Sequence, residues 1–276
     1  MPRAVSPPAP GPRASLWPFV LLCALSLLAC PRAAQAPAGP PPDAVAILER
    51  ARAAHQVPET LSADAKAFVD APENGGRYAL HVAVRRPQSI RIEALTPLGD
   101  PAAVLVADAG RFALLDLRQN VFYRGPASPE NLSRLLPAPL RDDELVSLLT
   151  GQLPALPGSE PISVKREGEG YRLVLSTVPP GTTTLRGYLQ EVLLGGDLRL
   201  LEVRRLTSQG ELLWEVRLDE HDDSSGAQVP RLLHLTAPAS KTGIDLRLRN
   251  LTVGKPPPSG AFLLGAPPGM EVRDVP

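Results

Sequence analysis

The hydrophobic positions of this chain change their period along the sequence. Near the start they recur at helical spacing, which predicts a helix over residues 43–56. The residues that share its apolar face are Ala44, Ile47, Leu48 and Ala51. Asp43 comes directly before them and can cap the first turn, because a carboxylate accepts hydrogen bonds from the first backbone N–H groups of a helix.

After this helix the period drops to two, which is typical of strands with one buried face. Five short strands are predicted at 78–84, 90–92, 102–107, 112–114 and 121–124. Of these, the stretch 102–107 is apolar on both faces. Seven more strands are predicted at 162–167, 170–177, 183–194, 198–207, 211–220, 230–236 and 243–253. The short turns between consecutive strands favour an antiparallel meander.

Two helices are predicted between the two sets of strands. The first begins after Ser128, a capping residue, and extends to Leu136, where Pro137 stops it. The second begins in an acidic run at Asp142, a composition that suits the positive end of a helix, and ends at Gly151.

These elements predict a fold that is mainly β with some α. We expect a curved antiparallel half-barrel of about eleven strands, covered by three helices, that encloses an apolar cavity. The folded domain is predicted to span residues 43–276. Its tail, residues 254–276, is rich in proline and glycine, and Phe262 is its one large anchor.

The first 29 residues are predicted to be a lipoprotein signal peptide. Two arginines precede an apolar run from Leu16 to Ala29, which is too short for a membrane-spanning helix of about 20 residues. The run ends Leu-Leu-Ala-Cys and resembles a bacterial lipobox, in which Cys30 becomes the lipidated first residue. The alternative is an ordinary signal peptide that is cut near Ala34 or Ala36.

Residues 30–42 are predicted to be the lipidated cysteine and a linker rich in proline and alanine, extended and semi-stiff. Removal of residues 1–29 leaves 27 basic and 29 acidic side chains. A body with this small negative charge has no long-range attraction to anionic lipid. Acyl chains on Cys30 are therefore expected to provide the attachment to a membrane.

Composition and motifs exclude several other functions. The whole chain has 29 basic and 29 acidic residues, so the clustered positive charge of a nucleic-acid-binding protein is absent. Its four histidines show no HExxH spacing, and no G-x-S-x-G elbow occurs. His221-Asp222-Asp223 is interpreted as a solvated loop rather than a metal or base–carboxylate site. We expect no enzyme, no catalytic residue, no cofactor and no metal.

The loop Leu95-Thr96-Pro97-Leu98-Gly99-Asp100 joins two strong predicted strands. Pro97 and Gly99 favour a tight turn, which places the large apolar side chain of Leu98 at its tip. Turn chemistry alone favours an interpretation in which Leu98 folds back onto the sheet. The alternative is that Leu98 stays exposed and contacts something outside the protein.

The order of these features resembles the periplasmic lipoprotein-sorting proteins, which are the carrier LolA and the outer-membrane receptor LolB. The resemblance covers roughly residues 43–275: an N-terminal helix, the Thr96-Pro97-Leu98-Gly99 loop, Arg111-Phe112-Ala113-Leu114, two short helices, and a leucine-rich strand from Val229. The chain is also similar to uncharacterised lipoproteins of the DUF4292 type. A predicted lipid anchor makes it more similar to the receptor than to the soluble carrier.

The resemblance implies a cavity that holds lipoprotein acyl chains, and a protruding leucine, matched by Leu98, that helps insert the cargo into the outer membrane. Pro97 and Gly99 would complete this membrane insertion loop. It implies a monomer in the cell envelope, lipid-anchored to the outer membrane and facing the periplasm, with inner-membrane anchoring still open. A docking role toward a LolA-like carrier stays open as well. The alternatives are a protein of the same fold that binds another amphiphile, or an envelope-stress sensor.

The predicted lipidation can be checked on the mature N-terminus. Mass spectrometry of the protein from its native envelope should find a first residue Cys30 that carries a diacylglyceryl group. Cys30→Ser should remove the modification and release the protein from membranes, because no other part of the sequence is predicted to anchor it. An unmodified N-terminus at Ala33 or later would contradict the prediction.

Overall fold

The computed structural model of the protein describes residues 43–72, 75–179 and 187–276. The predicted signal peptide, Cys30 and the linker lie outside the described residues, and so does the beginning of the strand predicted at 183–194. The helices are α1 (Ala44–Ala53), α2 (Pro129–Leu132) and α3 (Asp142–Leu149), with a 3-10 turn η1 (Pro238–Ser240). The strands are β1 (Thr60–Asp70), β2 (Gly76–Arg85), β3 (Ser89–Leu95), β4 (Pro101–Asp108), β5 (Arg111–Asp116), β6 (Val121–Pro126), β7 (Glu160–Glu167), β8 (Gly170–Ser176), β9 (Tyr188–Leu194), β10 (Leu200–Thr207), β11 (Leu212–Asp222), β12 (Val229–Ala237), β13 (Thr242–Val253) and β14 (Glu271–Asp274).

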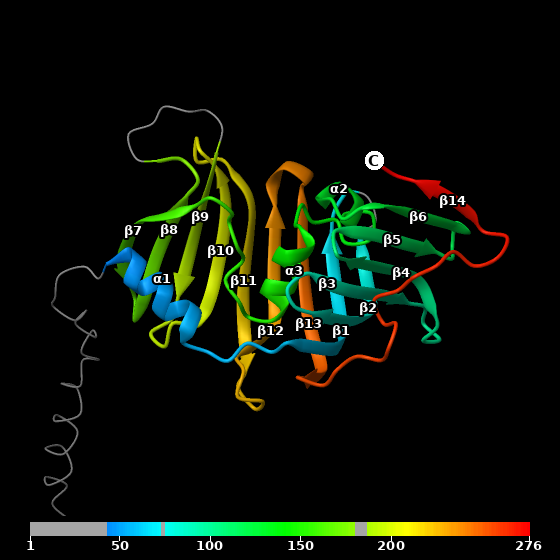
Figure 1. The fold of residues 1–276 in the computed structure, drawn as a ribbon, viewed down its shortest axis with the longest axis horizontal. Helices are drawn as coiled ribbons and strands as arrows, with labels where there is room; N and C mark the ends of the chain where they lie inside the picture. The colour runs from blue at the N-terminus through cyan, green and yellow to red at the C-terminus, as the bar shows by residue number, and fades with distance from the viewer. Residues whose placement is uncertain (1–42, 73–74, 180–186) are drawn as a thin grey trace, which may run out of the picture. The chain divides into compact units, whose positions relative to one another are not determined.

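The strands of the described residues form a single open, curled sheet (Figure 1). Its order is β14-β6-β5-β4-β3-β2-β1-β13-β12-β11-β10-β9-β8-β7. The short strand β14 is parallel to β6, and the other neighbouring pairs are antiparallel. The mainly β fold class and the antiparallel arrangement are therefore confirmed.

Two meanders, β1–β6 and β7–β13, lie side by side in this sheet. They join where β1 pairs with β13, in a register that sets Ala65 opposite Leu248. β6 lies next to one edge of the sheet, while β7 forms the opposite edge. The connection from β6 to β7 must therefore cross the sheet, and it carries α2 and α3 across one face (Figure 1).

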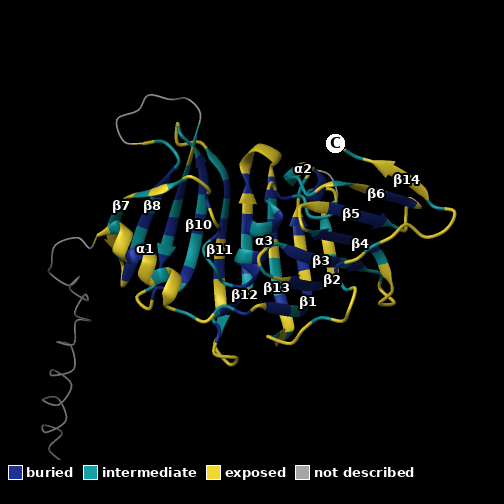
Figure 2. Ribbon diagram, in the orientation of Figure 1, coloured by how far each residue is buried: buried dark blue, intermediate teal, exposed yellow. Residues whose placement is uncertain are grey.

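The face that the helices cover, here called the inner face, holds the main core. Buried residues alternate with more exposed ones along many of the strands, and Figure 2 shows buried residues along the strands of the sheet and exposed residues at many of the turns. Ile47 of α1 and Leu148 of α3 belong to the same buried cluster as Leu105, Leu218 and Leu248 of the sheet. The helices thus remove the apolar side chains of the inner face from water, which is the main stabilising contribution to such a fold.

A second, smaller core lies on the outer face, where the tail of the chain forms a strap over the sheet. The buried members of this cluster are Val104, Val106, Leu115, Phe122 and Phe262. Strand β4 is therefore covered on both faces, which explains its apolar sequence. The guanidinium of Arg85 lies 4.8 Å from the ring centroid of Phe262, and Arg91 Nη1 donates to the Ala261 carbonyl at 3.1 Å.

The predicted strand count was too low, because the described residues form a sheet of 14 strands, of which β1 and β14 were not predicted. Strand β1 was missed because half of its buried positions are alanines, Ala63, Ala65 and Ala67, which weaken the apolar alternation. Strand β14 was missed because each of its residues is exposed and the strand is held by pairing with β6. The helix predicted from Ser128 to Leu136 is shorter and ends at Leu132.

The strap predicts a sharp contrast between two neighbouring residues. Phe262→Ala should lower the free energy of unfolding by about 3–5 kcal/mol, because it leaves a cavity under the strap. Leu263→Ala is the matched control and should change it by less than about 0.5 kcal/mol, since Leu263 is 75% exposed. Urea unfolding of the two variants measures the difference, and equal effects would contradict this account of the strap.

Candidate functional site

The hollow beneath α3 is much smaller than the predicted apolar cavity. It has a volume of about 50 Å³ and is lined by hydrophobic side chains of α3 and the strands that face it. Leu145, Leu148 and Leu149 of α3 and Leu140 before it occupy the space that the half-barrel was expected to leave open. Because ligand sites usually measure about 300–1,000 Å³, this hollow cannot hold an acyl chain in the conformation described here.

A larger groove of about 680 Å³ adjoins this hollow on the inner face. Leu80 and Leu136 line both spaces, so these two side chains separate the groove from the interior. Part of its floor consists of Ala67, Ala94 and Ala103. The short alanine side chains of β1, β3 and β4 leave room where longer side chains would fill it, and this explains the position of the groove.

Three connections of the chain form the rim of the groove. Thr96 and Pro97 come from the β3–β4 loop, and Arg118 comes from the β5–β6 turn. In an antiparallel meander these two connections fall at the same end of the sheet, and Leu117 N–H donates to the Ala102 carbonyl at 3.1 Å. The third connection is the stretch after α2, with residues 134–137, which forms the opposite wall.

The β3–β4 loop presents Leu98 to solvent. Leu98 is 91% exposed, so the interpretation in which it folds back onto the sheet was wrong. Gly99 N–H donates to the Thr96 carbonyl at 2.9 Å and Thr96 N–H to the Asp100 carbonyl at 2.7 Å, which close the turn. Gly99 has φ of +94°, a backbone conformation that favours glycine. Pro97 lines the groove, so Leu98 stands directly beside its mouth.

A buried ion pair fixes α3 against the sheet. Arg205 Nη2 of β10 lies 2.9 Å from Glu144 Oε1 of α3, and the two side chains are 6% and 2% exposed. Glu144 Oε2 also accepts the backbone N–H of Arg141 at 3.0 Å, which caps the start of α3. Sequence reasoning assigned the acidic run at 142–144 to capping alone, and the partner on a distant strand was missed.

The same arginine fixes the chain that follows α3. Arg205 Nη2 donates to Gln190 Oε1 at 2.6 Å, and Gln190 Nε2 donates to the Pro154 carbonyl at 3.0 Å. The guanidinium also lies 5.1 Å from the ring centroid of Trp214. Burial lowers the pKa of Arg205, and the Glu144 carboxylate opposes this shift by favouring the charged form. Burial likewise raises the pKa of Asp142 at the start of α3.

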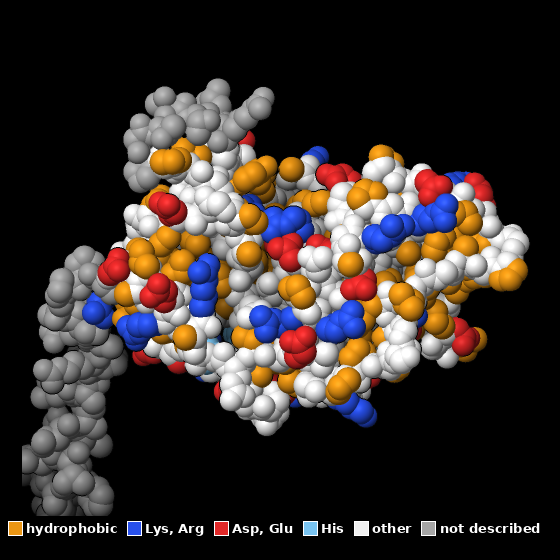
Figure 3. All heavy atoms as spheres, in the orientation of Figure 1, with side chains coloured by type: hydrophobic (Ala, Val, Ile, Leu, Met, Phe, Trp, Pro, Cys, Tyr) orange, Lys and Arg blue, Asp and Glu red, His pale blue; other side chains and the backbone are white. Residues whose placement is uncertain are grey.

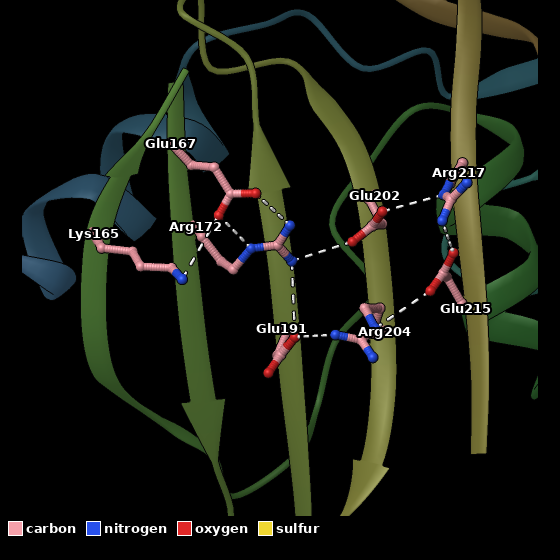
Figure 4. A network of polar contacts seen from close by, with 8 residues as sticks. All are labelled: Lys165, Glu167, Arg172, Glu191, Glu202, Arg204, Glu215 and Arg217. Carbon is pink, nitrogen blue, oxygen red and sulfur yellow. Dashed lines mark hydrogen bonds and ion pairs between the residues drawn. The ribbon is translucent and has the colours of Figure 1, made fainter. Parts of the chain in front are cut away.

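The outer face of β7–β11 carries a network of charged side chains that neutralise one another. Figure 4 shows its members, which are Lys165, Glu167, Arg172, Glu191, Glu202, Arg204, Glu215 and Arg217. Arg172 Nε lies 2.6 Å from Glu167 Oε2 and Arg172 Nη1 3.1 Å from Glu202 Oε1. Its hydrogen bond with Glu167 raises the pKa of Arg172 and lowers that of Glu167. Opposite charges alternate throughout, so this face offers no surplus charge to a ligand.

The histidines described below contact a backbone carbonyl or a carboxylate on the sheet, and none of these contacts resembles a catalytic pair with a nucleophile. His221 and Asp222 are the last residues of β11 rather than part of a solvated loop, which corrects the earlier interpretation. His221 Nε2 contacts the Leu200 carbonyl at 3.1 Å, and burial lowers its pKa. Two cross-strand pairs on the outer face were missed: His81 Nδ1 with Asp64 Oδ1 at 3.2 Å, and His234 Nδ1 with Asp245 Oδ1 at 2.6 Å. Strand pairing creates both.

Two further features bear on the kind of site that the chain can form. Within the described ranges 43–72, 75–179 and 187–276, no group of three or more His, Cys, Asp and Glu side chains is placed to hold a metal ion. In the same ranges, no helix has both the length and the apolar character that a bilayer crossing requires.

Comparison with known proteins finds neighbours among solved structures. No family model and no curated protein matches the sequence. A domain described as an outer membrane lipoprotein-sorting protein domain, from Vibrio parahaemolyticus, is similar with a TM-score of 0.57 and 12% identity, over 80% of this chain and 97% of that one. A LolA superfamily protein from Nitrosomonas europaea has a TM-score of 0.53 and 14% identity, over 78% and 94%. A DUF1329 family protein from Desulfovibrio piger has a TM-score of 0.59 and 10% identity, over 79% and 95%.

The ion pair between α3 and β10 predicts a non-additive effect on stability. Glu144→Leu should lower the free energy of unfolding by about 3–5 kcal/mol, because it leaves the Arg205 guanidinium buried without a counter-charge. Combining it with Arg205→Met should recover most of this loss, since neither charge of the pair remains. Urea unfolding of the single and double variants measures the coupling.

An exposed ion pair provides the control for this experiment. Arg247 and Glu220 form a pair whose side chains are 41% and 49% exposed. Arg247→Met should therefore cost less than about 1 kcal/mol. If Glu144→Leu costs no more than this control, the buried pair does not hold α3 in place.

Proposed function

The chain has a LolA/LolB-like fold, and from this premise we propose that it is a lipid-anchored protein of the cell envelope that binds the acyl chains of lipoproteins and helps to insert them into the outer membrane. The observation that carries the proposal is the position of the exposed Leu98 beside the mouth of the groove. One feature accounts for binding and the other for delivery, and the two lie next to each other at one end of the sheet.

The groove suits a flexible hydrocarbon chain. Its volume of about 680 Å³ lies within the usual range for ligand sites, and aliphatic side chains and alanines make up much of its lining. Burial of a sixteen-carbon chain is worth about 12 kcal/mol at about 0.8 kcal/mol per methylene. The groove has to replace most of this for the chain to leave a carrier or a membrane. The aliphatic part of the lining provides this, while the charged side chains of the groove lie at its rim.

A movement of the wall between the groove and the interior would lengthen the binding site. Leu136 separates the two spaces and belongs to the connection after α2, which lies outside the strands of the sheet. Displacement of Leu135, Leu136 and Pro137 would join the groove to the apolar space beneath α3. In this proposal the described conformation is the closed, unloaded one, and the cargo creates the remainder of its cavity.

Delivery depends on contact with a bilayer. Burial of an exposed leucine side chain in an apolar phase yields about 1.5–3 kcal/mol, enough to hold the groove's mouth against a membrane transiently. Transfer then follows the difference in affinity between groove and bilayer. The predicted anchor at Cys30 and a linker of twelve residues, at most about 37 Å when extended, keep the domain close to that membrane.

Two substitutions separate binding from delivery. Leu98→Glu should slow the transfer of a palmitoylated peptide from the protein to neutral phosphatidylcholine liposomes about tenfold or more, because a carboxylate opposes entry into the bilayer. It should leave binding of the peptide unchanged, since Leu98 does not line the groove. Ala94→Phe should weaken binding itself, because it fills the groove. Fluorescence of a labelled acyl chain reports both steps.

Leu263→Glu is the matched control for Leu98→Glu. Leu263 is also a highly exposed leucine, at 75%, but it belongs to the strap on the outer face. Transfer by this variant should equal that of the wild type. If the wild type, Leu98→Glu and Leu263→Glu transfer the peptide at equal rates, Leu98 has no role in insertion.

A further inference from the structure

Two positively charged side chains line the groove without a carboxylate partner among the described residues. Arg118 comes from the β5–β6 turn, and Arg134 comes from the connection after α2. Arg134 Nε donates to Asn131 Oδ1 at 3.4 Å, and its guanidinium lies 5.0 Å from the ring centroid of Tyr123. Both of these partners are uncharged, so the positive charge of Arg134 is not neutralised.

Many other charged side chains of the protein are paired with a group of opposite charge. Acidic and basic side chains are interspersed on the face seen in Figure 3, and those of the outer-face network neutralise one another. Asp116 is the single acid that lines the groove. Its Oδ1 accepts the backbone N–H groups of Arg118 at 2.9 Å and Gln119 at 3.0 Å, so this carboxylate serves the turn. The lining therefore has a surplus of positive charge.

An apolar floor with guanidinium groups at the rim matches the chemistry of an amphiphile with an anionic head. A guanidinium presents N–H donors in a planar fork that fits the oxygens of a carboxylate or a phosphate. An uncharged glyceride in the same groove would leave both guanidinium groups without a partner of opposite charge.

We propose that the groove binds a single-chain amphiphile with a carboxylate or phosphate headgroup, which Arg118 and Arg134 hold at the rim while the acyl chain lies along the alanine floor. The inference rests on the proposed function in one respect, namely that the groove holds an acyl chain. It goes beyond that function by assigning the groove a further class of ligand, whose headgroup carries the negative charge that Arg118 and Arg134 select.

Binding of ligands with the same sixteen-carbon chain and different heads tests the proposal. The probes are palmitate, palmitoyl lysophosphatidylglycerol and uncharged monopalmitoylglycerol, all measured below their critical micelle concentrations by displacement of an apolar fluorescent dye. The wild-type protein should bind at least one anionic probe about tenfold or more tightly than monopalmitoylglycerol. The anionic probe that binds with the higher affinity shows whether the site prefers a carboxylate or a phosphate headgroup. Added salt should narrow the difference, because both guanidinium groups are exposed.

Replacement of Arg118 and Arg134 tests whether these two residues cause the preference for anionic headgroups. Arg118→Gln combined with Arg134→Gln should bring the affinity for the anionic probe down to that for monopalmitoylglycerol. Arg111→Gln combined with Arg249→Gln removes the same charge from exposed positions outside the groove lining and should keep the preference. Should the double variant at the groove fail to fold, Arg118→Gln alone provides the test, since no side-chain hydrogen bond or ion pair of Arg118 is found among the described residues.

The outcomes separate this inference from the proposed function. If the wild-type protein binds all three probes equally, or if the arginine variants keep the preference, headgroup selection by Arg118 and Arg134 is wrong while acyl-chain binding stands. If none of the probes displaces the dye, the groove is not an acyl-chain site and both proposals fail.

Discussion

The inner face of this protein depends on one topological constraint, which is that the chain leaves the sheet at β6 and re-enters it at β7. These strands lie near opposite edges, so the connection between them has to run across the sheet. It supplies the leucines that cover the inner face, and without them a wide apolar surface would face water. The β6–β7 connection, with α2 and α3, thus covers the core although the backbone hydrogen bonds of the sheet do not hold it in place.

This constraint explains why a few polar side chains matter so much. Glu144 and Arg205 join the crossing connection to β10 through charges that are almost fully buried. Charges at this depth are stable only with their partners in place, so the pair specifies where α3 can lie. The length of side chains along the sheet then decides where space remains. Leucines fill the interior beneath α3, and alanines of β1, β3 and β4 leave the groove beside it.

Much of the fold could be predicted from the sequence, whereas the site could be predicted only in part. Alternation located most of the strands, and the turn chemistry of Pro97 and Gly99 identified the loop that carries Leu98. The filled interior could not be predicted, because periodicity shows which residues face inward but not how closely they pack. Arg118 and Arg134 were missed for a similar reason. These two residues are far apart in the sequence, and both reach the groove only because of the strand pairing and the course of the connection after α2.

The strap on the outer face has a consequence for the order in which the domain can be completed. Val104 and Val106 are covered by Phe262, more than 150 residues later in the chain, and β1 pairs with β13 over a similar separation. A polypeptide that emerges from its N-terminal end therefore exposes both surfaces until nearly all of its length has followed. During synthesis the unfinished β-sheet therefore keeps an unpaired strand edge and an uncovered apolar face, and both are closed only when the last few dozen residues are in place.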